Sequence, residues 1–89
     1  MKGNDMAEEH IQALDLAANG DWDGAHNLIQ DYHDELAGLI HGYLHREEGD
    51  LSNANYWYSR VGQSIPDNSL EQEFERLYVL SQQSQQSEY

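Results

Sequence analysis

The sequence contains no cysteine, which excludes disulfide bonds, thiolate nucleophiles and thiolate metal ligands together. Long apolar runs are also missing. Nowhere do about 18 consecutive apolar residues occur, so no segment is predicted to cross a bilayer. No apolar run follows Lys2, so no secretory signal is visible. We therefore expect a cytoplasmic protein with no membrane partner.

Basic residues are scarce. Four Lys and Arg stand against 17 Asp and Glu, which gives a net charge of -13. A chain with this balance repels phosphate backbones and anionic headgroups, so we expect no nucleic-acid partner. A protein or peptide partner, if there is one, is expected to be basic. The ordinary interpretation of such an acidic surface is solubility.

The apolar spacing is helical along the whole chain. Ile11, Leu14 and Ala18 recur at steps of three and four, and similar stripes follow in later segments. These patterns predict a single all-α domain over residues 1–80 with five helices. We expect a first hairpin over about 6–33, a second over about 34–65 and a capping helix over about 67–80. Residues 81–89, rich in Ser and Gln, are expected to form a flexible polar tail.

The sequence also predicts where the helices end and begin. Gly20 and Gly49 are each followed by Asp, a pairing that ends one helix and caps the next. Pro66, the only proline, is expected to end the fourth helix. Ser69 and Gln72 then have the spacing of a capping box at the start of the fifth helix.

The chain contains an internal repeat. A shift of 29 residues lays Gly20-Asp21 on Gly49-Asp50 and Ala25 on Ala54. Each half is a helix, a Gly-Asp turn and a second helix with a small residue early. A connection this short predicts antiparallel helices. Gly42 or Ala54 at the crossing would let the two backbones approach closely.

The second half resembles the tetratricopeptide repeat through Gly42, Ala54, Tyr58 and Pro66. The stretch 45–50 is also similar to one in a group of small uncharacterised bacterial proteins. The tetratricopeptide resemblance implies two tandem hairpins whose first helices line a peptide-binding face, and hence an interaction or adaptor module. A homodimer would double that face. By position the face would include five residues: His10, Leu14, Leu39, Tyr43 and Arg46.

A metal site is the alternative function. His41 and His45 are four residues apart, so they project from the same face of one helix, with Glu48 about one turn further on. His26, on the preceding helix, could complete the set. The competing interpretation is that these histidines are ordinary amphipathic side chains facing a neighbouring helix. No nucleophile motif or phosphate-binding glycine loop is present, so we expect neither catalytic activity nor a cofactor.

Overall fold

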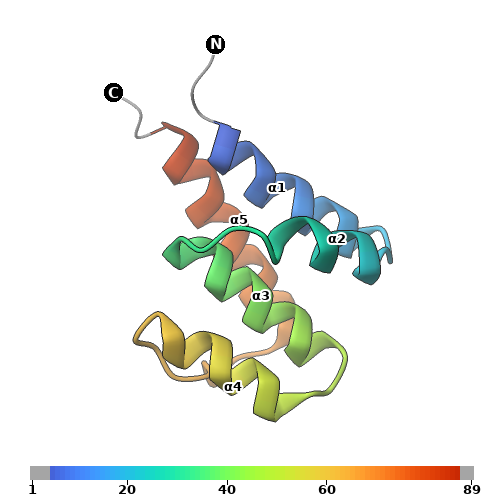
Figure 1. The fold of residues 1–89 in the computed structure, drawn as a ribbon, viewed down its shortest axis with the longest axis vertical. Coiled ribbons are helices and arrows are strands. Elements are labelled where there is room, and N and C mark those ends of the chain that lie inside the picture. The colour runs from blue at the N-terminus through green and yellow to red at the C-terminus, as the bar shows by residue number, and fades with distance from the viewer. Residues whose placement is uncertain (1–4, 87–89) are drawn as a thin grey trace.

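The computed structural model describes residues 5–86, and side chains over residues 8–83. Within that range it is all α-helical, as predicted (Figure 1). The helices are α1 (Asp5–Ala18), α2 (Trp22–Ile29), α3 (Glu35–Glu47), α4 (Leu51–Arg60) and α5 (Leu70–Gln86). None of the helices in the described range has both the length and the apolar character needed to span a membrane.

The predicted turns between α1 and α2 and between α3 and α4 are confirmed. Gly20 and Gly49 adopt φ values of 83° and 85°, the left-handed conformation that ends a helix. Asp21 and Asp50 then accept backbone hydrogen bonds from the first turns of α2 and α4, which satisfies donors that have no partner within the helix. Asp34 caps α3 in the same way.

The connection between α4 and α5 confirms one prediction and contradicts another. Ser69 and Gln72 form the predicted capping box, since each side chain accepts the other's backbone N–H at 3.0 Å. The expectation that Pro66 ends α4 is wrong. The helix stops at Arg60, and Gly62, with φ of 78°, makes the turn before the proline is reached.

Adjacent helices pack in pairs, α1 on α2 and α3 on α4. In the second pair Gly42 lies at the crossing. A Cβ atom there would stand 2.8 Å from the Tyr58 ring and 3.4 Å from the Ala54 carbonyl oxygen. These distances leave no room for a side chain, so the close approach predicted at Gly42 and Ala54 is confirmed.

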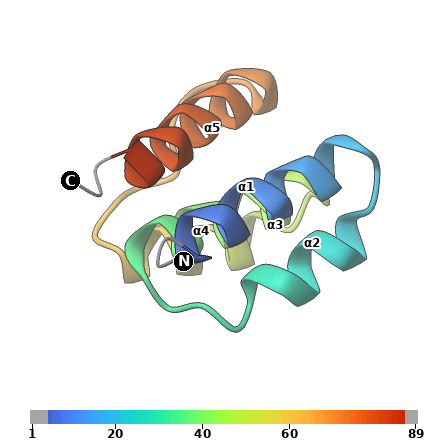
Figure 2. The same cartoon turned by 90° about the horizontal axis from the view of Figure 1, so that it is seen from above.

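Helix α5 lies along α1 and α3, on the side away from α2 (Figure 2). The predicted capping helix therefore covers the first helices of both pairs. Its buried positions are Glu73, Leu77 and Ser81, at steps of four. Leu70, the first residue of the helix, is 37 % exposed. The sequence pattern identified an amphipathic helix but not the surface that it covers.

That placement overturns the predicted peptide-binding face. His10, Leu14, Leu39 and Tyr43 are all buried, at 0–5 % exposure, and the His10 ring lies 2.9 Å from the Asp34 carboxylate. The fifth residue of that face, Arg46, is hydrogen-bonded to the segment that leads into α5. A face already filled by the chain's own α5 cannot receive a peptide. The predicted face is therefore wrong as a set, since His10, Leu14 and Tyr43 are packed inside the chain and only Leu39 borders a surface groove.

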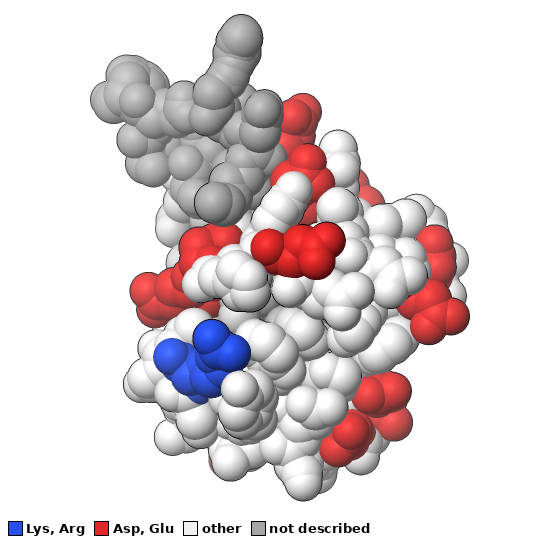
Figure 3. All heavy atoms as spheres, in the orientation of Figure 1, with Lys and Arg blue, Asp and Glu red and all other residues white. Residues whose placement is uncertain are grey.

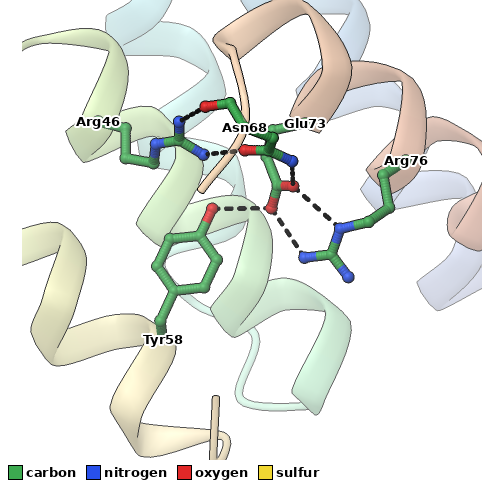
Figure 4. Close-up of polar contacts among 5 residues, drawn as sticks. All are labelled: Arg46, Tyr58, Asn68, Glu73 and Arg76. Carbon is green, nitrogen blue, oxygen red and sulfur yellow. Dashed lines mark hydrogen bonds and ion pairs between the residues drawn. The ribbon is translucent and has the colours of Figure 1, made fainter. Parts of the chain in front are cut away.

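A buried polar network fixes α5 to the rest of the molecule (Figure 4). The fully buried carboxylate of Glu73 accepts hydrogen bonds from Tyr58, Asn68 and Arg76, all at 2.8–2.9 Å. Arg46 donates to both the side-chain and backbone oxygens of Asn68. A buried charge is tolerated only when it is paired and hydrogen-bonded, and these donors meet that requirement.

The C-terminal helix is longer than predicted. It continues to Gln86, past the expected end near residue 80. Ser81, which we assigned to a polar tail, is completely buried and donates a hydrogen bond of 2.8 Å to the Leu77 carbonyl oxygen. The prediction of a tail is therefore wrong for residues 81–86, and residues 87–89 lie outside the described range.

Candidate functional site

Three histidines from two helices meet on one side of α3. His41 and His45 project from successive turns of α3, and His26 approaches from α2. One ring nitrogen from each of the three histidines lies within 4.8 Å of the other two. The Nε2 atoms of His26 and His41 are only 3.1 Å apart. The histidines that the sequence suggested as a set are therefore brought together by the fold.

The position of α3 explains why these polar rings are enclosed. Every residue from 37 to 45 is buried, because α1, α2, α4 and α5 all pack around this helix. His41 and His45 are each 5 % exposed, whereas His26, on the outer helix α2, is partly exposed. The cluster therefore has two ligands anchored in the interior and a third near the surface.

Two tryptophans hold the rings in place. Trp22 stacks on His26 with ring centroids 4.8 Å apart, and its indole N–H donates a hydrogen bond of 2.7 Å to the Leu44 carbonyl oxygen. Trp57, from α4, stacks on His41 at 3.8 Å. Nothing in the sequence spacing of the two tryptophans showed that they pack against histidines.

Glu48 determines which ring nitrogen of His45 carries the proton. Its carboxylate oxygen lies 2.8 Å from the Nδ1 atom of His45. A carboxylate can only accept a hydrogen bond, so Nδ1 carries the proton and donates it. In the neutral ring this leaves the lone pair on Nε2. Metal-binding histidines commonly use this arrangement, in which a carboxylate on one nitrogen orients the other.

The environment keeps the other two rings uncharged. Burial, with smaller effects from His26, His45 and Arg60, lowers the pKa of His41 from 6.5 to about 3. Burial and then the neighbouring His45 also lower the pKa of His26. A neutral imidazole retains the lone pair that a metal ion requires, so protons do not compete for these two rings near neutral pH.

The spacing of two of the three rings suits tetrahedral coordination. With metal–nitrogen bonds of about 2.0–2.1 Å, two ligand nitrogens of a tetrahedral zinc site stand about 3.3 Å apart. The 3.1 Å separation of the His26 and His41 nitrogens is close to that value. A metal ion would replace the single N–H···N contact between these rings, each ring then carrying its proton on Nδ1.

A second group of potential ligands, His45, Glu48 and Asp50, lies at the end of α3. It is less suited to a metal. Glu48 and Asp50 are both exposed, and Asp50 already serves as the cap of α4 through the backbone and side chain of Asn53. Capping accounts for Asp50, and the contact with His45 accounts for Glu48.

Comparisons with protein-family models, with curated proteins and with solved structures find no match.

Proposed function

We propose that this protein is a metal-binding helical protein that holds one divalent transition-metal ion, zinc foremost, between α2 and α3. The ligands are the Nε2 atoms of His26, His41 and His45, with Glu48 orienting His45. The single observation that supports the proposal most is the convergence of three ligand atoms within 4.8 Å from residues up to 19 positions apart.

The donor set also supports this assignment. Imidazole suits zinc, copper and nickel, and zinc imposes no geometry of its own beyond its preference for four ligands. Burying His41 and His45 costs desolvation that apolar residues of similar size would avoid. Metal ligation offsets that cost. The acidic surface, on which basic atoms form one isolated group on the face drawn in Figure 3, would also raise the local concentration of cations.

A zinc titration of the untagged, chelator-treated protein tests the proposal. We expect one equivalent of zinc to bind and to raise the melting temperature. At 100 times the dissociation constant the native state gains about 2.7 kcal/mol. For a domain of this size that corresponds to a shift on the order of 10 °C. Tryptophan fluorescence gives a second readout, because Trp22 and Trp57 both contact candidate ligands.

Matched substitutions locate the site. His26→Ala removes a partly exposed ligand and should abolish the zinc-induced shift while the metal-free protein remains folded. His33→Ala is the control, because His33 is exposed and lies outside the cluster. Unchanged melting in saturating zinc, or an equal loss of binding in both variants, would overturn the proposal.

The interaction-module function stays a prediction, but it needs a surface that shares only Leu39 with the one first expected. An open groove of about 620 Å³ lies between α3 and α5, lined by residues that include Leu36, Leu39, Arg76 and Leu80. Asp34 and Glu35 line it as well, so the groove combines apolar side chains with one cation and two carboxylates, and its chemistry identifies no occupant.

A further inference from the structure

The histidine cluster supplies three ligands, whereas a tetrahedral metal ion takes four. Among the described residues, the group of converging ligand atoms contains His26, His41 and His45 and no further His, Asp or Glu. Asp23 influences His26 electrostatically but does not belong to this group. Glu48 hydrogen-bonds the Nδ1 atom of His45 and acts electrostatically on His26, but it does not belong to this group either.

The number of protein ligands distinguishes two kinds of zinc site. Structural sites are closed by four protein ligands, whereas sites with three keep one position for water or another exogenous molecule. We propose that the metal centre of this protein has an open fourth position that takes a small monodentate ligand: water, hydroxide or a small inorganic anion. This inference rests on the proposed metal-binding function and adds the class of ligand that the metal exchanges.

The surroundings of the cluster restrict the size and charge of that ligand. Trp22 and Trp57 lie with their ring faces against His26 and His41, so flat aromatic walls occupy two sides of the cluster. His26 is the partly exposed member, which brings the coordination sphere near solvent at α2. The Arg60 guanidinium lies 5.0 Å from the Trp57 ring centre and acts electrostatically on His41. The aromatic walls favour a compact ligand over a bulky one, and the positive charge of the metal ion excludes a cation. Glu48 and Asp23 act electrostatically on His26, so Arg60 does not by itself make the site selective for anions.

Cobalt(II) substitution makes the fourth position visible, because the visible bands of this ion report coordination number and ligand exchange. The chelator-treated full chain is loaded with one equivalent of Co²⁺ and then titrated with azide. Equilibrium dialysis measures whether the ion stays bound. We expect a saturable shift of the visible bands that fits one azide per metal while Co²⁺ remains on the protein.

The outcomes separate the two proposals. If Co²⁺ gives only the spectrum of the aqueous ion, the metal-binding function fails and the open position fails with it. If Co²⁺ binds but azide leaves its bands unchanged, metal binding stands and the open position is overturned.

If Co²⁺ binds but azide leaves its bands unchanged, Glu48→Ala tests whether Glu48 occupies the fourth coordination position. A response to azide that appears only in this variant would show that Glu48 is the fourth ligand in the unaltered protein, which contradicts the proposal. An equal azide response in both proteins supports it.

Discussion

The Tyr58 hydroxyl donates a hydrogen bond of 2.8 Å to the Glu73 carboxylate, and both residues are completely buried. This contact joins α4 to α5, two helices that do not otherwise pack against each other. Burial acts to raise the pKa of Glu73, but hydrogen bonds from Arg76, Asn68 and Tyr58 outweigh it and lower the pKa. Glu73 is therefore held as a carboxylate inside the domain.

Tyr58→Phe tests this contact. The substitution removes one donor and leaves a buried carboxylate oxygen less satisfied, which should lower the free energy of unfolding by about 1–3 kcal/mol. Tyr56→Phe is the matched control. Tyr56 is 52 % exposed, and its hydrogen bond from Arg60 lies at the surface, so its loss should cost no more than about 0.5 kcal/mol. Equal urea midpoints for the two variants would contradict a stabilising role for the buried contact.

The crossing of α3 and α4 gives a second prediction. Ala54 is fully buried where Gly42 lets the helices approach, so Ala54→Leu should destabilise the protein by about 1–3 kcal/mol through overpacking. Ala18→Leu makes the same change at an exposed position of α1 and should be close to neutral. Thermal melting of the two variants compares them directly. If Ala54→Leu melts with the wild type, the crossing is not as tight as the distances indicate.

Local features of this fold could be predicted from the sequence because they depend on a few adjacent residues. Gly20 and Gly49 adopt the expected left-handed conformation, and Asp21 and Asp50 cap the helices that follow. Each of these features is set by backbone sterics and by one hydrogen bond within three residues. Long-range packing plays almost no part in them.

The surface against which α5 packs could not be predicted from such local features. Its apolar stripe indicates that one face is buried, but several surfaces of a helical pair could cover that face. Glu73 occupies the centre of the buried stripe, and a charged residue there is normally a sign of solvent exposure. Arg76 lies three residues away on α5 itself, but Tyr58 comes from α4, so the full network that makes its burial tolerable exists only in the folded chain.

The histidine cluster could be predicted in part from the sequence. The spacing of His41 and His45 on one helix predicted that they share a face, as they do. The approach of His26 was foreseen as one option and depends on how α2 packs against α3. The stacking of Trp57 on His41 depends on the crossing of α4 and could not be read from the sequence.

Acidification of the metal-free protein should reveal the buried imidazoles. Burial lowers the pKa of His41 to about 3, whereas in the unfolded chain it is 6.5. Below pH 6.5 the unfolded state therefore binds more protons, and stability falls as the pH falls toward the folded value. We expect the free energy of unfolding to drop by about 1–2 kcal/mol between pH 7.5 and pH 5, since one proton contributes about 1.4 kcal/mol per pH unit.

Urea unfolding in the presence of a chelator measures this dependence. His41→Phe, which keeps an aromatic ring beside Trp57, should show a smaller loss between the two pH values, whereas His33→Gln should behave as the wild type. A wild-type protein as stable at pH 5 as at pH 7.5 would show that His41 is not kept neutral by burial. Glu73 should act at lower pH, because its lowered pKa places its contribution above about 4.5 and its loss below.

The last prediction concerns the carboxylate beside His45. The Glu48 carboxylate lies 2.8 Å from Nδ1 of His45, which leaves the lone pair of the neutral ring on Nε2, the atom proposed to bind the metal. Loss of such a partner weakens metal affinity by about 10- to 100-fold. Glu48→Gln should therefore raise the zinc dissociation constant within that range without abolishing binding, because a Gln side-chain oxygen still accepts a weaker hydrogen bond.

Glu47→Gln removes the same charge from the neighbouring exposed residue and should leave the affinity nearly unchanged, provided the effect is not one of net charge. Competition against a chromogenic zinc chelator measures both constants. Equal weakening in the two variants would assign the effect to general electrostatics, and complete loss in Glu48→Gln would instead identify Glu48 as a direct ligand.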